Sequence, residues 1–453
     1  MARRTINGMP GDAEADAKPG PWRHAPGGMT GVSSEGEPGR SDLPRRKMLA
    51  GMAATLLAPA VLAQAPPRII VIGGGFGGAS CARALRRLGL AVTLVEANPV
   101  YTACPLSNGV LTGLREMGDQ QFSYAGLERA GVMLVRGTAA GIDATARSVQ
   151  LADGSRMAYD RLVVAPGIDF RFDAIAGYSE AASHTLPHAW KAGAQTILLR
   201  DQLAAMRDGG LFVISVPDTP YRCPPAPYER ASLVAHYFKA QKPRSKIILL
   251  DAKDVFPRRA EFQEAWQRLY PGMVEWVPLS SSGKVTSVDV AGMVLTTDFD
   301  SYACDVANII PPQKAGRIAH GASLADRSGW CPVNALTFES LLVPGVHVIG
   351  DAMTAGPVPR SASAAQAEGR ACAGAIAAMV AGADVPSQTL ASTCYAFAAP
   401  EEAFPIRGHY APGAEGFAEV AAAPDAPSGA ARRASEAENG RVWFEGIGRE
   451  VFG

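Results

Sequence analysis

The sequence predicts an α/β protein with two Rossmann-like, dinucleotide-binding-type domains on parallel sheets, followed by a small C-terminal α+β domain. Three observations carry this prediction. The chain has 453 residues, enough for about three domains of roughly 150 residues each. A buried-strand pattern runs directly into a glycine-rich turn and a helix near residue 73. A second pair of strand patterns recurs at residues 211–216 and 246–251.

Composition excludes several classes of protein. Hydrophobic residues make 47% of the chain and charged residues 19%, which is typical of a chain that buries a core. The 43 basic residues are balanced by 43 acidic ones without a long basic stripe, so no nucleic-acid partner is expected. Seven cysteines are too few for a disulfide scaffold, and an odd number leaves at least one unpaired.

Residues 1–65 are predicted to be a disordered leader and signal peptide. Arg45 and Arg46 precede a mostly apolar run at 48–63 that Pro59 interrupts. This run is short for a spanning helix, which needs about 20 apolar residues, and the arginine pair is typical of twin-arginine export. We therefore expect a periplasmic protein without an integral membrane span. The alternative is an uncleaved anchor.

The first nucleotide site is predicted just after the leader. The strand pattern at 68–72 leads into Gly73, Gly75 and Gly78, the G-x-G-x-x-G spacing, and a helix pattern follows. The next strand ends at Glu96, where an acidic side chain can hold ribose hydroxyls. Glycines let the backbone approach a pyrophosphate at the positive end of the helix. The alternative is a purely structural glycine-rich turn.

Two later segments favour FAD as the dinucleotide. A strand pattern at 160–167 ends in Gly167, and another at 345–351 ends in Gly-Asp, followed by a helix pattern at 363–380. This order resembles two-dinucleotide-domain flavoproteins, and the resemblance implies that Asp351 binds the ribityl and pyrophosphate side of FAD.

The second domain lacks a phosphate-binding turn. After the strand at 211–216 comes a proline-rich segment with Cys223 and with no glycine before Arg230. Proline has no N–H to offer a phosphate, so NAD(P)H binding is not expected. The strand pattern at 246–251 indicates that the fold itself is retained. A flavin enzyme of this kind needs another electron donor.

From about residue 68 to the C-terminus the sequence resembles the flavoprotein subunit of flavocytochrome c sulfide dehydrogenase. The matching stretches, in chain order, are Cys104-Pro-Leu-Ser-Asn108, Leu186-Pro-His-Ala-Trp-Lys-Ala-Gly193, Arg222-Cys-Pro-Pro-Ala-Pro-Tyr-Glu-Arg-Ala-Ser232, Ile310-Pro-Pro-Gln313, Gly329-Trp-Cys-Pro-Val333 and Thr337-Phe-Glu-Ser340. The resemblance implies a sulfide dehydrogenase that passes electrons through FAD to a c-type cytochrome subunit.

The resemblance also implies roles for three cysteines. Cys223 and Cys331 would form a redox-active disulfide beside the flavin, and Cys104 would carry FAD through a thioether. Around Cys104 this chain reads Tyr-Thr-Ala-Cys-Pro, where family members have Tyr-Thr-Cys-Tyr, so covalent attachment is less firmly implied than FAD binding. An inert structural disulfide is the alternative for Cys223 and Cys331.

The resemblance and the strand order divide the chain into four parts. These are the leader (1–65), a discontinuous FAD-binding domain (66–185 and 305–385), a degenerate NAD-binding-like domain (186–304) and a C-terminal dimerisation and cytochrome-interface domain (386–453).

Chemistry supports the implied centre. The sulfide anion can attack a disulfide sulfur to give a persulfide and a free thiolate, and flavin accepts electron pairs and releases single electrons. Glu229, six residues after Cys223, is a candidate general acid/base. The alternative for Glu229 is a carboxylate that stabilises a helix start.

The remaining cysteines are predicted to be structural. Cys81 and Cys372 lie in helix patterns and are expected to pack as small hydrophobic residues; Cys304 and Cys394 receive no role. No cysteine spacing matches a zinc site, so no metal is expected. The chain has no C-x-x-C-H haem motif, so haem would belong to the partner.

Two rival functions are less well supported than the preferred one, and the tail argues against the first of them. Residues 411–440 are rich in Ala, Gly, Pro and charge and are predicted to be a flexible loop. Sulfide:quinone oxidoreductases carry amphipathic membrane-dipping helices at this end, and none is predicted here, which makes that enzyme the runner-up. The other rival is a redox-inert, FAD-bearing interaction protein, for which the two Cys-Pro cysteines would have no use.

Overall fold

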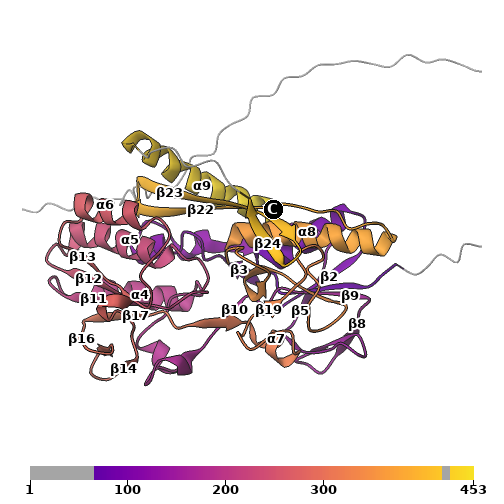
Figure 1. The fold of residues 1–453 in the computed structure, drawn as a ribbon, viewed down its shortest axis with the longest axis horizontal. Coiled ribbons are helices and arrows are strands. Elements are labelled where there is room, and N and C mark those ends of the chain that lie inside the picture. Colours follow the sequence, from indigo (N-terminus) through magenta and orange to yellow (C-terminus); the bar gives the residue numbers. More distant parts are fainter. Residues whose placement is uncertain (1–65, 421–428) are drawn as a thin grey trace, which may run out of the picture. The chain divides into compact units, whose positions relative to one another are not determined.

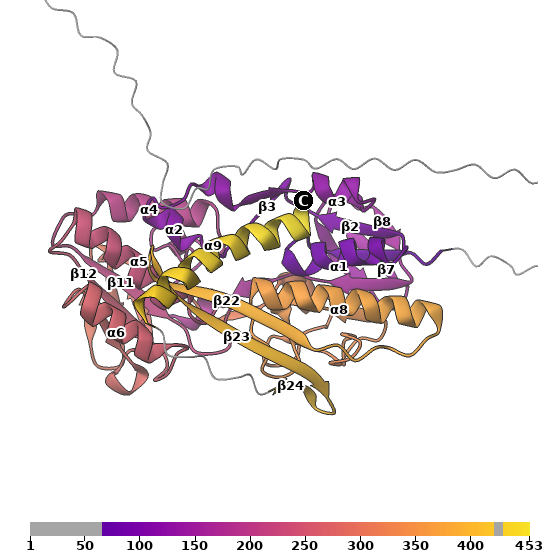
Figure 2. The same ribbon diagram turned by 90° about the horizontal axis from the view of Figure 1, so that it is seen from above.

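The computed structural model describes residues 66–420 and 429–453. The predicted leader lies outside the described residues. The described chain from Pro67 onward forms one compact unit, and its main elements are shown in Figure 1 and, turned by 90°, in Figure 2. None of the helices in these ranges has both the length and the hydropathy needed to cross a lipid bilayer.

The first sheet is parallel throughout, as predicted. Its strands stand in the order β20 (Val346–Val348), β9 (Arg161–Val164), β1 (Ile69–Ile72), β2 (Val92–Glu96) and β5 (Met133–Arg136). All four residues of β1 are buried, which is typical of a parallel strand covered on both faces. Helices α1 (Phe76–Arg87) and α8 (Ala362–Ala381) pack against each other. Strand β20 pairs with β9, so residues from both predicted segments of the first domain share one sheet.

Small antiparallel elements complete the first domain. They are β3 (Val100–Thr102) with β4 (Gln121–Ser123); β6 (Ala139–Asp143), β7 (Ser148–Leu151) and β8 (Arg156–Ala158); β10 (Ile168–Phe170) with β18 (Gln313–Ala315); and the short helices α2 (Asn108–Leu111), α3 (Ala125–Arg129) and α7 (Arg317–Gly321). A short parallel pair joins β19 (Cys331–Pro332) to β21 (Met353–Thr354).

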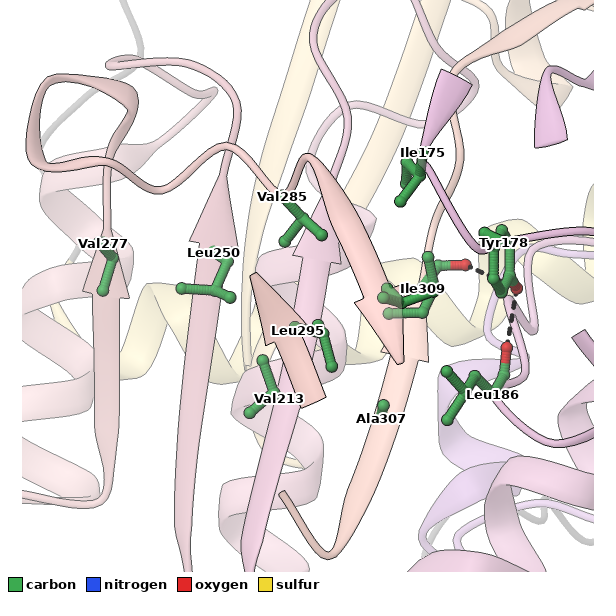
Figure 3. Close-up of a cluster of buried hydrophobic side chains, with 11 residues drawn as sticks. Ile175, Tyr178, Leu186, Val213, Leu250, Val277, Val285, Leu295, Ala307 and Ile309 are labelled. Carbon is green, nitrogen blue, oxygen red and sulfur yellow. Dashed lines mark hydrogen bonds between the residues drawn. The ribbon is translucent and has the colours of Figure 1, made fainter. Parts of the chain in front are cut away.

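The second sheet is also parallel, in the order β13 (Val274–Val277), β12 (Lys246–Asp251), β11 (Leu211–Val216) and β17 (Val306–Ile309). Helices α4 (Ala194–Ala205), α5 (Ala226–Gln241) and α6 (Arg259–Leu269) belong to this domain, as do β14 (Ser287–Asp289), β15 (Val294–Thr296) and β16 (Ser301–Ala303). Figure 3 shows part of its core, where the Tyr178 hydroxyl donates to the Leu186 carbonyl at 2.7 Å.

The structure moves one predicted domain boundary. β17 pairs with β11 in the second sheet, so the second domain extends past residue 305, where the first domain was expected to resume. The apolar run at Val306–Ile309 is buried in a parallel sheet, and a continuous apolar run does not reveal which of two such sheets it joins.

The predicted flexible tail is wrong where the structure describes it. Strands β22 (Leu390–Ala399), β23 (Glu402–Gly413) and β24 (Gly416–Val420) form an antiparallel sheet, and α9 (Ala430–Phe452) is a helix of 23 residues. Both views show α9 lying along this sheet (Figures 1 and 2). The buried side of α9 includes Phe444, Ile447, Val451 and Phe452. Its apolar face is therefore covered by the protein itself.

Candidate active site

A cavity of about 600 Å³ lies where the strands of the first sheet end. This flavin cavity, as we call it, has the volume of a cofactor site. Its wall includes all seven residues that the sequence analysis assigned to cofactor binding, namely Gly73, Gly75, Gly78, Glu96, Cys104, Gly167 and Asp351. All but Cys104, which follows the antiparallel strand β3, come from four parallel strands and the segments after them, which meet at one edge of the sheet.

The glycine-rich turn is too crowded for side chains. A Cβ at Gly78 would overlap the carbonyl oxygen of Gly73, and a Cβ at Gly73, where φ is +95°, would overlap the carbonyl oxygen of Ala165. Helix α1 begins at once after Gly75, so its free amide groups face the turn. The turn thus fits the pyrophosphate of FAD.

Glu96 is held at the cavity wall by its own neighbours. One carboxylate oxygen accepts from the Gly74 amide at 2.7 Å, and the other accepts from the backbone and side-chain amides of Asn98 at 2.7 and 2.8 Å. Each carboxylate oxygen can accept more than one hydrogen bond, so Glu96 can still bind a ribose hydroxyl.

Arg222 is a site residue to which sequence reasoning gave no role. Its guanidinium lies 3.6 Å from the Asp351 carboxylate and also donates to the Trp190 carbonyl. Burial works against the charge of Arg222, but the neighbouring Cys104 and Asp351 outweigh it and raise its pKa. The sequence signal was present, because Arg222 directly precedes Cys223 in the longest matching stretch.

A smaller cavity of about 80 Å³ adjoins the flavin cavity. This thiol cavity has three cysteines in its wall, Cys104, Cys223 and Cys394, together with Glu229. It shares four lining residues with the flavin cavity: Cys104, Pro105, Arg222 and Ala362. A reactive sulfur here would therefore lie beside a cofactor held in the flavin cavity.

The backbone around the thiol cavity is strained. Cys223 has a φ of +55°, and Leu106 and Ala189, which also line the cavity, have φ of +62° and +45°. Residues other than glycine rarely adopt this region, and such strain concentrates at functional sites. The Cys223 amide donates to the Arg360 carbonyl at 2.9 Å, which fixes the turn that begins α5.

Glu229 is buried in the first turn of α5, and its carboxylate is held from two sides. The Asn108 side-chain amide donates to it at 2.7 Å and the Phe397 backbone amide at 3.2 Å. Burial raises the pKa of Glu229 to about 7, although these two hydrogen bonds and Arg230 act to lower it. A carboxyl of this pKa can both give and take protons near neutral pH.

Cys331 lies near Arg360. It pairs with Met353 across β19 and β21, close in sequence to Asp351. Burial raises the pKa of its thiol to about 12, although the Arg360 guanidinium acts to lower it. Cys331 is not in the wall of the thiol cavity. The structure holds all seven cysteines as free thiols.

The place of a second nucleotide is filled from within. Asp251 ends β12, as the ribose-binding acid of a nucleotide domain would, but its carboxylate is fully buried. It accepts from the Tyr228 hydroxyl at 2.6 Å, from the Trp276 indole at 2.9 Å and from the Lys253 ammonium at 2.7 Å. Because this carboxylate is fully buried, it is not accessible to a nicotinamide-nucleotide ribose.

The structure also places three of the cysteines to which the sequence gave no catalytic role. Cys81 and Cys372 are fully buried in α1 and α8, as predicted, whereas Cys394 lines the thiol cavity. Among the residues that the structure describes, no group of three or more His, Cys, Asp or Glu side chains is placed to hold a metal ion.

Family models match three parts of the chain. Residues 67–195 match the pyridine nucleotide-disulphide oxidoreductase family, residues 196–311 the central domain of the sulfide dehydrogenase [flavocytochrome c] flavoprotein chain, and residues 386–452 the flavin-binding domain of flavocytochrome c sulphide dehydrogenase.

Curated relatives and solved structures agree with these matches. The sulfide dehydrogenase [flavocytochrome c] flavoprotein chain of Chlorobaculum thiosulfatiphilum is 53% identical over 45 residues, which cover 94% of that sequence and 10% of this one. The mitochondrial sulfide:quinone oxidoreductase of Mus musculus is 23% identical over 324 residues, 66% of this chain and 68% of the relative. The structure of the Aquifex aeolicus sulfide:quinone oxidoreductase superposes with a TM-score of 0.67 at 17% identity, over 85% of this chain and 92% of the other, and shows the shared fold.

Proposed function

Because the chain belongs to the family of flavocytochrome c sulfide dehydrogenase flavoprotein chains, a family of sulfide-oxidising flavoenzymes, we propose that it passes electrons from sulfide through FAD to a c-type cytochrome subunit. The proposal places a redox disulfide of Cys223 and Cys331 beside the flavin. One observation carries it: the thiol cavity, with Cys223 in its wall, adjoins the flavin cavity through shared residues.

The chemistry begins at the disulfide. The sulfide anion attacks one sulfur, the S–S bond breaks, and one cysteine becomes a persulfide while the other leaves as a thiolate. The buried guanidinium of Arg222, beside Cys223, favours anions at this point. Bound FAD supplies an acceptor for the electron pair and a donor of single electrons to haem.

Glu229 accepts a proton in this proposal, and Asp351 and Cys104 bind the cofactor. Glu229 lines the thiol cavity and has a pKa of about 7, so it can take the proton that sulfide or a thiol releases. Asp351, paired with Arg222, lines the flavin cavity on the side of the Gly-Asp turn. Cys104 lines both cavities, which supports its proposed thioether to FAD.

Two features support a cytochrome rather than a nicotinamide nucleotide as electron partner. The internally bonded Asp251 leaves the second domain without a ribose acceptor. Cys223 stands where the phosphate turn of such a domain would be. The proposed periplasmic location rests on the arginine pair and apolar run before residue 65.

Anaerobic addition of sulfide to the FAD-loaded protein tests the proposal through bleaching of the flavin absorption. We expect Cys223→Ser and Cys331→Ser to abolish bleaching while FAD stays bound, and Cys304→Ser, whose sulfur contacts the Met293 carbonyl in the second domain, to bleach normally. If the flavin stays oxidised in the unaltered protein, the proposal is wrong, and the remaining interpretation is a redox-inert, FAD-bearing interaction protein.

The same sample identifies the acceptor and the FAD linkage. Reduction of cytochrome c or of a co-purifying haem subunit supports the proposal, whereas reduction of a soluble quinone alone would favour a sulfide:quinone oxidoreductase. Acid precipitation should release FAD from Cys104→Ser but not from the unaltered protein if the thioether exists.

A further inference from the structure

The thiol cavity contains a cysteine that the proposed reaction does not use. Cys394 lies in its wall with Cys223 and Glu229, and the three side chains come from β22, from the turn before α5 and from α5. A volume of about 80 Å³ holds two or three groups the size of a water molecule. The cavity that both thiols line thus has room for added sulfur atoms.

Cys394 is held in place by its surroundings. Its strand pairs with β23, where Cys394 lies opposite Ile406, and packs against both α5 and α8. The hydroxyls of Ser361, which caps α8, and of Ser392 act to lower the pKa of the Cys394 thiol, against the larger effect of burial. The free amides at the start of α8 thus lie near a sulfur that must become an anion to react.

The charge of Glu229 influences the pKa of both thiols. Its charge acts to raise the pKa of Cys223 and of Cys394, in each case after the larger effect of burial, which leaves the pKa of Cys394 at about 11. Strand β22 also holds Glu229 directly, through the Phe397 amide. A base of pKa about 7 therefore lines the same cavity as two thiols that need to lose a proton to react.

We propose that Cys394 receives the sulfur atom that sulfide oxidation leaves on Cys223. Glu229 takes the Cys394 proton, and the resulting thiolate attacks the terminal sulfur of the Cys223 persulfide. The bond between that sulfur and Cys223 breaks, a new S–S bond to Cys394 forms, and Cys223 leaves as a thiolate. This transfer moves no electrons to or from the flavin.

The transfer would explain how the centre resets. With its sulfur handed on, Cys223 can re-form the disulfide with Cys331, and the two electrons of the two thiolates pass to FAD. Cys394 then carries the sulfur while a second sulfide reacts. This inference rests on the proposed function, in particular on attack of sulfide at the disulfide with the persulfide on Cys223.

The test locates the sulfur by mass spectrometry. FAD-loaded protein receives one equivalent of sulfide without oxygen, persulfides are trapped with an alkylating agent, and the peptides are compared. We expect the added sulfur on the Cys394 peptide of the unaltered protein and on the Cys223 peptide of Cys394→Ser. In Cys394→Ser, bleaching of the flavin should already be about tenfold slower in the first turnover, because Cys223 keeps the sulfur and cannot re-form the disulfide with Cys331.

Two further variants keep the result interpretable. Cys304→Ser removes a cysteine outside the cavity and should place the sulfur as the unaltered protein does. Glu229→Gln should hold it on Cys223 at neutral pH. A bleached flavin with sulfur found only on Cys223 or Cys331 of the unaltered protein overturns the inference and leaves the proposed function intact. A flavin that never bleaches refutes the proposed function itself.

Discussion

The guanidinium of Arg222 lies 3.6 Å from the carboxylate of Asp351, and this ion pair stands where the flavin cavity meets the thiol cavity. Both side chains are largely buried, at 17% and 14% exposed, so solvent screens their charges little. One cation therefore serves two purposes: it positions a cofactor-side carboxylate and favours negative charge on the sulfur beside it.

Replacing Arg222 should make Cys223 less reactive. Burial raises the pKa of the Cys223 thiol, and Arg222 opposes that effect. In the reduced protein, Arg222→Gln should slow alkylation of Cys223 at a fixed pH by about tenfold, the effect of one pKa unit on the thiolate fraction. Labelling followed by peptide mass spectrometry measures it. Arg244→Gln, which alters an exposed pair with Asp208, is the control, and equal rates in both variants would refute the role of Arg222.

Gly78→Ala should yield a folded protein that retains little FAD. The new Cβ would overlap the Gly73 carbonyl oxygen, which is backbone and cannot move aside without opening the turn. The ratio of flavin to protein absorbance after purification measures retention. Gly118→Ala is the matched control, because a Cβ at Gly118 meets no atom within 4 Å. Full FAD content in Gly78→Ala would show that the turn is not the pyrophosphate site.

The Phe452 side chain should contribute to the stability of the fold. The Phe452 ring stacks on Tyr101 and on Phe122, with centroids 5.2 Å apart in each pair, and meets the edge of Phe76 at 5.7 Å. Phe452→Ala should lower the free energy of unfolding by roughly 3–5 kcal/mol and weaken FAD retention, since Tyr101 lines the flavin cavity. Denaturant unfolding measures the loss. Phe299→Ala, at a side chain 85% exposed, should be nearly neutral.

Local sequence patterns predicted the parts of this fold that local physics decides. The strands at Leu211–Val216 and Lys246–Asp251 match their predicted bounds, because a short apolar run before a turn signal has few alternatives. The glycine-rich turn was found because its steric demand appears in the sequence itself. Its placement beside Glu96 followed from the strand order.

The tail and the site residue Cys394 could not be predicted in the same way. Helix α9 contains Ala and charge of the kind that also makes linkers, and what fixes it is contact with β23 and ion pairs such as Arg433 with Glu402 at 2.9 Å. Nothing near Cys394 in the sequence marks it as part of a site. Its strand reaches the thiol cavity through a contact such as Phe397 with Glu229, 168 residues apart. Such long-range packing is set only in the folded chain.

Glu368 should make the protein less stable as the pH rises. It is 2% exposed, accepts from the Gly350 amide at 2.6 Å, and burial raises its pKa to about 8. Between pH 4.5 and 8 the unfolded state ionises this group while the native state keeps the proton, so the free energy of unfolding falls with pH. Glu368→Gln cannot ionise and keeps an acceptor for Gly350. Above pH 8 it should exceed the unaltered protein in stability by a few kcal/mol.

Denaturant unfolding at pH 5 and pH 8.5 checks this prediction. The change in the free energy of unfolding between the two pH values is compared in Glu368→Gln and the unaltered protein, so the contributions of all other titrating groups cancel. Near pH 5 the two proteins should be almost equally stable, because the native carboxyl is then protonated and as neutral as the amide. The exposed Glu445, changed to Gln, should leave the pH dependence unaltered. If Glu368→Gln and the unaltered protein lose stability in parallel up to pH 8.5, the carboxyl is ionised in the native state, and the Gly350 amide then outweighs its burial.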